Sequence, residues 1–187
     1  MRENSYEQSA VIEGSGASVY SIVYSDMDGD GQTELIVGWR VNAELQALSV
    51  YALTPAGTKE LLRSVSYVRY ASADLDGDGL QELVVLHADE EGEGVADYYD
   101  WQEGGLTAQS PARISITMAE LSQHGRLNAG KLKAGEFALF VTGVTEQSGA
   151  VTDILAVRNG ELTNIVLSEA TGVSGEIAPF YRRYPMD

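Results

Sequence analysis

The stretch "SDMDGDGQTELIVGW", residues 25–39, is followed forty-eight positions later by "ADLDGDGLQELVVLH", residues 73–87. In both copies aspartates occupy every second position, glycines stand between them, and a glutamate comes four residues after the last aspartate. A run of β-forming residues then begins, "ELIVGW" in one copy and "ELVVLH" in the other. This agreement in register predicts that both copies fold into the same loop followed by the same kind of strand.

The repeated unit continues beyond the strand that follows each loop. A second strand-like run stands at 47–53, "ALSVYAL", and its counterpart at 95–101, "VADYYDW". After a turn that contains glycine comes a third run, "LLRSVSYV" at 61–68 and "ARISITM" at 112–118. Each unit of about fifty residues therefore predicts three or four short strands joined by turns.

A third and weaker copy follows the first two. "GEFALFVTG", residues 135–143, places Glu136 where Glu34 and Glu82 stand in the earlier copies. "TDILAVRNGELTNIVL" then supplies two more runs, and the Asn159-Gly160 pair between them is typical of a tight hairpin turn. The repeat therefore extends over most of the chain.

The strand-rich repeat predicts the fold class. Helical periodicity is weak, with one short candidate at 118–124, "MAELSQH", so βαβ units are not expected. Units of three or four strands at this period are typical of β-propeller blades. We expect an all-β protein with about three blades, a partial propeller, because closure takes roughly four to eight; a curved stack or open sheet is the alternative. The single domain spans 1–187, with repeats at about 18–66, 67–120 and 121–170 and the start of a further repeat at 171–187.

The strands themselves carry a pattern of alternating faces. Leu35, Val37 and Trp39 share one face of the first strand after the loop, which predicts strands with one buried face. The equivalent positions in the second copy are Leu83, Val85 and His87. Aromatic side chains could also line a carbohydrate-binding face, although packing within strands is the favoured interpretation. The aromatic residues concerned are Trp39, Tyr98, Tyr99 and Trp101.

Composition narrows the classes of function. Twenty-eight acidic residues face twelve basic ones, and the net charge of −16 disfavours binding to nucleic acid or to anionic lipid. The sequence has no cysteine, which excludes disulfides, thiolate metal sites and cysteine nucleophiles. It has no apolar stretch long enough for a membrane span, and the first ten residues, "MRENSYEQSA", lack the apolar core of a signal peptide. We expect the chain to be part of a longer protein.

Alternate side chains of a tightly wound loop converge on one centre, which is what a metal ion requires. In the first copy the ligands would be the carboxylates of Asp26, Asp28, Asp30 and Glu34 and the backbone carbonyl of Gln32. In the second copy they would be the carboxylates of Asp74, Asp76, Asp78 and Glu82 and the backbone carbonyl of Leu80. A shell made only of oxygen suits Ca²⁺, whereas Mg²⁺ retains waters and Zn²⁺ prefers nitrogen or sulfur. The sequence therefore predicts two Ca²⁺ sites.

Charge repulsion supports the same interpretation. Carboxylates about 4 Å apart repel by roughly 4 kcal/mol per pair at an effective dielectric of about 20, so an ion-free loop is expected to be strained or disordered. Gly31 at position six of the loop permits the reversal of the backbone. In the third copy, counting back eight from Glu136 reaches Asn128, and the next alternate positions are Gly130 and Leu132. That copy is predicted to have lost its ion.

An EF-hand requires a glutamate at position twelve of its loop, and this chain has Val37 and Val85 there. The pattern D-x-D-x-D-G-x-x-E before an apolar strand, at 26–35 and 74–83, instead resembles the integrin-like FG-GAP repeat and the related VCBS repeat of bacterial surface proteins. With the third copy, the resemblance covers roughly 18–170. It implies a β-propeller with Ca²⁺ in loops between blade strands and an extracellular setting. The chain departs from the pattern in three ways: it has glutamate at position nine, it lacks a clear Phe-Gly pair, and its third loop lacks the three aspartates.

Catalytic motifs are absent from the sequence. It contains no Walker loop and no G-x-S-x-G elbow. Its two histidines are His87, expected to be a packed or surface residue of a strand, and His124, expected in a loop. We therefore do not expect an enzyme active site within this chain.

Two functions follow as hypotheses. The first is a binding or scaffold module, stapled by structural Ca²⁺, of an exported bacterial surface protein or lipoprotein whose signal or lipid anchor lies outside this chain. Its ligand would be a protein or a glycan. The alternative is a non-catalytic fragment or accessory part of a polysaccharide-degrading propeller enzyme.

Overall fold

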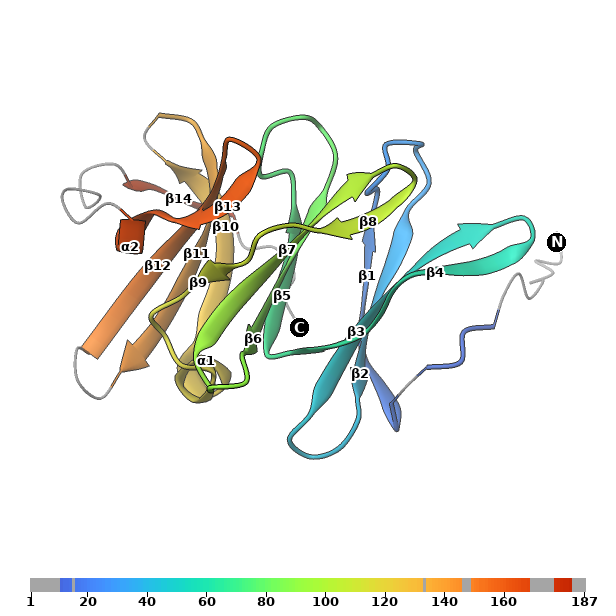
Figure 1. Ribbon diagram of the computed structural model, residues 1–187, viewed down its shortest axis with the longest axis horizontal. Helices are drawn as coiled ribbons and strands as arrows, with labels where there is room; N and C mark the ends of the chain where they lie inside the picture. Colours follow the sequence, from blue (N-terminus) through green and yellow to red (C-terminus); the bar gives the residue numbers. More distant parts are fainter. Residues whose placement is uncertain (1–10, 15, 133, 146–148, 169–176, 183–187) are drawn as a thin grey trace, which may run out of the picture.

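The computed structural model describes residues 11–14, 16–132, 134–145, 149–168 and 177–182. In this part of the chain, strands predominate and form three antiparallel sheets that stand side by side (Figure 1). The predicted all-β class is confirmed, whereas each sheet is open at its edges and closure into a propeller stays a prediction. Neither described helix is long and apolar enough to cross a membrane.

The first two sheets are meanders in which each strand pairs with the next along the chain. The first sheet consists of β1 (Ser18–Ser25), β2 (Glu34–Arg40), β3 (Gln46–Thr54) and β4 (Gly57–Tyr67). The second sheet consists of β5 (Arg69–Ala73), β6 (Glu82–Ala88), β7 (Gly94–Gln102) and β8 (Gly105–Ala108), with β9 (Ala112–Arg113) paired to β7. The acidic stretches join the first strand to the second in both sheets, so they occupy equivalent positions.

The predicted strand at 112–118 is wrong beyond its first two residues, which form β9. Ser115 donates its backbone N–H and its hydroxyl to the buried carboxylate of Asp153, at 2.8 and 2.7 Å, and this draws the chain away from the sheet. Thr117 then caps helix α1 (Met118–His124) through a capping box. The helical turn suggested at 118–124 is confirmed.

The third sheet has five strands in the order β13-β12-β11-β10-β14. Its elements are β10 (Arg126–Leu132), β11 (Phe137–Thr145), β12 (Gly149–Arg158), β13 (Glu161–Asn164), the short helix α2 (Ile165–Ser168) and β14 (Ile177–Arg182). The hairpin turn predicted at Asn159-Gly160 is confirmed, because both residues have the positive φ, 56° and 79°, that this turn requires.

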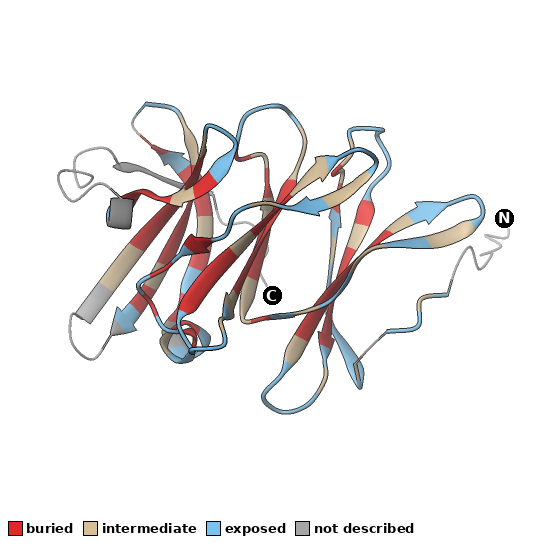
Figure 2. Ribbon diagram, viewed as in Figure 1, coloured by how far each residue is buried: buried red, intermediate tan, exposed pale blue. Residues whose placement is uncertain are grey.

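The second sheet lies between the other two, and this decides how its strands are buried. Leu83 and Val85 of β6 belong to a core cluster shared with the first sheet, while Val84 and Leu86 belong to one shared with the third. Figure 2 shows buried residues along the central strands of all three sheets. The prediction of strands with one buried face is therefore wrong for β6, because a sheet covers it on each side. It is also wrong for β2, because Ile36 on one face and Val37 and Trp39 on the other are all buried.

Contacts between β1 and β5 place the first two sheets in register. The hydroxyl groups of Ser25 and Ser72 are 2.7 Å apart, and those of Ser21 and Tyr70 are 3.0 Å apart. Since each acidic loop begins where one of these strands ends, the two loops emerge next to each other at one edge of the molecule (Figure 1).

Candidate metal centres

Each acidic loop is anchored to the core by the apolar residue at its second position. Met27 in the first loop is 0% exposed and Leu75 in the second is 3% exposed. The aspartates on either side of these anchors retain access to solvent. Burial of one side chain thus holds the loop against the sheets while its acidic side chains stay at the surface. The sequence analysis missed these anchors, although both copies have an apolar residue at this position.

The two loops share three backbone hydrogen bonds at equivalent positions, and the first loop has one more, from the N–H of Gly31 to Asp26 Oδ2 at 3.2 Å. In the first, the N–H of Gly29 donates to Asp26 Oδ1 at 2.9 Å, and in the second the N–H of Gly77 donates to Asp74 Oδ1 at 2.7 Å. The backbone N–H at position five donates to the aspartate Oδ1 at position three, at 3.0 Å in both loops. The backbone N–H at position seven donates to the aspartate Oδ1 at position five, at 2.7 Å in both. The aspartates therefore fix the loop conformation through local bonds to the backbone.

Glycine at position six is required by the backbone. Gly31 has φ +82° and Gly79 has φ +95°, a region that residues with a Cβ rarely adopt. This confirms the predicted reversal at Gly31. Gly29 has a further constraint, because a Cβ there would lie 2.7 Å from Cδ2 of Leu80, in the neighbouring loop. The two loops are thus close enough to touch.

The glutamate at position nine is the first residue of the second strand, and its side chain turns back into the loop. Glu34 Oε2 accepts a hydrogen bond from the N–H of Met27 at 2.9 Å, and Glu82 Oε2 accepts one from the N–H of Leu75 at 2.6 Å. Burial and, to a smaller extent, the negative charge of the loop aspartates together raise the pKa of Glu82 to about 8, against the lowering effect of that hydrogen bond. Burial also raises the pKa of Glu34.

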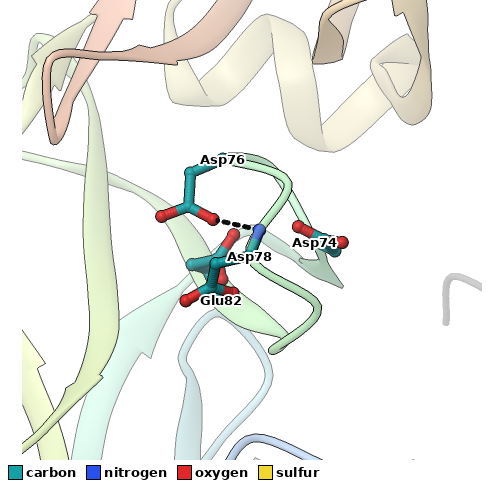
Figure 3. Close-up of side chains that lie close together, drawn as sticks. All are labelled: Asp74, Asp76, Asp78 and Glu82. Atoms are coloured by element: carbon teal, nitrogen blue, oxygen red, sulfur yellow. Dashed lines mark hydrogen bonds between the residues drawn. The ribbon is translucent and has the colours of Figure 1, made fainter.

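Both loops bring carboxylates together. The carboxylates that meet in the second loop are those of Asp74, Asp76, Asp78 and Glu82 (Figure 3). Those that meet in the first loop are Asp26, Asp28 and Glu34. Within each group, the oxygens that would face an ion all lie within 4.8 Å of one another. The second group therefore offers four carboxylates to a metal ion and the first offers three.

Three predicted ligands lie outside these groups. The carboxylate of Asp30 accepts from the backbone N–H of Gln32 at 2.7 Å and from its side-chain amide at 3.0 Å. Gln32 and Leu80 were predicted to bind through their carbonyls. The structure places their N–H groups on the carboxylates of Asp30 and Asp78, and the role of the carbonyls stays a prediction.

The donor set fits a hard divalent cation. The grouped side chains offer oxygen only, the ligand that Ca²⁺ prefers. Among the residues that the structure describes, no lysine or arginine nitrogen lies within 4.0 Å of a carboxylate of either loop. Burial raises the pKa of Asp76, and its acidic neighbours add to this. The negative charge of the loops is therefore left for a cation or for protons to neutralise.

The third copy is built differently from the alignment that its sequence suggested. Asn128, Gly130 and Leu132, which were placed at the loop positions, all lie in β10, because only a short turn separates β10 from β11. Glu136 at the end of that turn forms an ion pair with Arg158, with Nε–Oε1 at 3.0 Å and a second bond of 3.2 Å to Oε2. In the described part of the chain, the acidic groups able to hold a metal are those of the first two loops.

His87 is half-buried in β6, as expected for a packed or surface residue. Its Nε2 lies 2.9 Å from Asp97 Oδ2, and its Nδ1 lies 2.9 Å from the carbonyl oxygen of Ala88. His124 is the last residue of α1 rather than part of a loop, and its side chain lies outside the described residues.

The aromatic residues divide between packing and surface. Trp39, Tyr98 and Tyr99 are buried, which confirms strand packing for these three. Trp101 is half-buried and lines a cleft beside the first acidic loop. This position could not be read from the sequence, because the cleft is formed by segments from two sheets.

Comparisons of this chain with protein-family models, with curated proteins and with solved structures found no match.

Proposed function

We propose that this chain is a calcium-binding module of β-propeller type, related to FG-GAP and VCBS repeats, and that it serves as a scaffold or binding unit. The proposal includes an exported bacterial surface protein or lipoprotein as its setting, with a protein or glycan as ligand. The observation that carries it is the matched pair of carboxylate groups, each closed by a buried glutamate that bonds the loop backbone.

The ion would act on the strand that follows each loop. Glu34 and Glu82 are the first residues of β2 and β6, which are central strands of their sheets. Bound Ca²⁺ supplies the positive charge that allows these buried carboxylates and the nearby aspartates to stay ionised together. For a Kd of about 10⁻⁴ M and about 1 mM ion, as in extracellular modules, binding stabilises the fold by about 1.4 kcal/mol per site.

Calorimetric titration of chelator-treated protein with Ca²⁺ tests the proposal. We expect two ions per chain. Asp28→Ala and Asp76→Ala should each reduce the number to one, because each removes a carboxylate from a different group. Glu161→Gln, at an exposed acid of β13, serves as the control and should leave two. Absence of binding heat, together with a melting curve that chelator does not change, would contradict the proposal.

A further inference from the structure

A cleft of about 290 Å³ lies beside the first acidic loop. The loop forms one wall, the β3–β4 hairpin forms another, and the β7–β8 hairpin of the second sheet forms the third. This volume is close to the lower end of the range for small-molecule sites, about 300–1,000 Å³. The cleft therefore suits a ligand about the size of a single sugar ring.

Polar, basic and aromatic side chains line the cleft together with aliphatic ones such as Leu53 and Leu61. Asp28, Asp30 and Gln32 offer hydrogen-bonding groups from the loop, and Lys59 offers an ammonium group from β4. Lys59 Nζ donates to the carbonyl oxygen of Gly104 at 3.2 Å, so it bridges the two hairpins. Trp101 supplies an aromatic surface and packs against the core between the first two sheets, which limits its movement. Several hydrogen-bonding groups around one fixed aromatic ring suit a saccharide.

The two acidic loops differ in the number of carboxylates that they bring together, and the cleft lies beside the first loop. The second loop brings four carboxylates together, whereas the first brings three, and the carboxylate of Asp30 accepts an additional hydrogen bond from the side-chain amide of Gln32 at 3.0 Å. An ion in the first loop would thus have one carboxylate fewer, and Asp28 and Glu34 of its ligand group also line the cleft. An oxygen atom of a ligand in the cleft would be able to supply a further ligand to that ion.

Charge selects the class of ligand. The four acids of the first loop, one divalent ion and Lys59 leave a single net negative charge at this site. That charge disfavours a ligand that carries a carboxylate or sulfate. We propose that the cleft binds a neutral saccharide, with hydroxyl groups on the ion of the first loop and on Asp30, and with the apolar face of the ring against Trp101. The ion-dependent part of this inference rests on the proposed function.

NMR titration of the native protein with methyl α-mannoside, methyl β-galactoside and glucuronate tests the inference. The chain has two tryptophans, so the ¹H–¹⁵N spectrum has two indole signals, and Trp101→Phe identifies the one from Trp101. We expect at least one neutral glycoside to shift the Trp101 signal in a saturable way in 1 mM Ca²⁺. Its affinity should fall at least tenfold in chelator, and glucuronate should bind more weakly.

Variants locate the binding site. Trp101→Ala should lower the affinity at least tenfold, whereas Tyr24→Ala, at a 65% exposed aromatic residue of β1, should leave it unchanged. If neither glycoside binds, if binding does not depend on Ca²⁺, or if glucuronate binds best, the inference is wrong. Calorimetry on the same sample separates the two proposals: two bound Ca²⁺ ions without glycoside binding overturn the cleft alone, and no bound Ca²⁺ overturns the proposed function.

Discussion

The first two acidic loops and the third hairpin place a glutamate at the same position of the repeat in different charge environments. Glu34 and Glu82 stand at the start of a strand, are buried and have no basic partner within 4.0 Å in the described chain. Glu136 stands just before β11 and pairs with the guanidinium of Arg158. The β10–β11 hairpin, whose glutamate is paired with an arginine, has only a short turn. The two loops whose glutamates have no basic partner are longer and rich in aspartate. This difference supports a metal ion as the partner of the first two glutamates.

Removal of Ca²⁺ should produce the largest effect. Two proposed sites that each contribute about 1.4 kcal/mol would together stabilise the protein by about 3 kcal/mol. For a chain of this length, chelator should therefore lower the melting temperature by about 6–12 °C. Hydrogen exchange would sharpen the comparison: amides in 26–34 and 74–82 should lose protection, and those of the β10–β11 hairpin should keep it. Equal loss of protection in all three places would contradict a role specific to the loops.

The ion-free protein should also respond to pH. The pKa of Glu82 is raised in the fold, chiefly by burial, from its ordinary value of about 4.5 to about 8. Between these values the folded state holds a proton that the unfolded state has released, so stability should fall as pH rises from about 4.5 to 8. Denaturant unfolding in chelator at several pH values measures this. Glu82→Gln keeps an acceptor for the N–H of Leu75 and should flatten the profile, whereas Glu136→Gln should not.

Loss of one site should have about half the effect of chelation. Asp28→Ala and Asp76→Ala should each lower the melting temperature in Ca²⁺ by about 3–6 °C, because one linkage of about 1.4 kcal/mol disappears. The loss should be larger for Asp76→Ala, since the second group contains more carboxylates and is expected to hold its ion more tightly. Scanning calorimetry with and without chelator checks both. Parent-like melting of either variant in Ca²⁺ would remove the structural role of that ion.

The third hairpin should give the smallest effect. Arg158→Gln removes an ion pair that is about one-third exposed, with side-chain exposures of 33% and 29%. Such a pair contributes about 0.5–1 kcal/mol, so the melting temperature should fall by about 1–4 °C. The shift caused by Ca²⁺ should be the same as in the parent protein. A Ca²⁺ response that grows in Arg158→Gln would show that Glu136 can also recruit an ion.

The sequence was sufficient for the features that depend on local chemistry. Aspartates at alternate positions accept hydrogen bonds from backbone N–H groups a few residues ahead, and Gly31 and Gly79 permit positive φ. Two stretches with the same pattern of aspartate and glycine therefore adopt similar loops. The same local origin explains why the Asn159-Gly160 turn was predicted correctly. These interactions span only a few residues, so they can be predicted from the repeated pattern in the sequence.

Tertiary structure decided what depends on residues far apart in the chain. Both faces of β6 are buried because a sheet lies on each side, and Ser115 leaves the strand pattern because Asp153 accepts its hydrogen bonds. The partner of Glu136 and the cleft beside Trp101 likewise come from segments that meet only in the folded chain. Packing between sheets sets these contacts, and the alternation of residues along one strand carries no information about which sheet lies beside it.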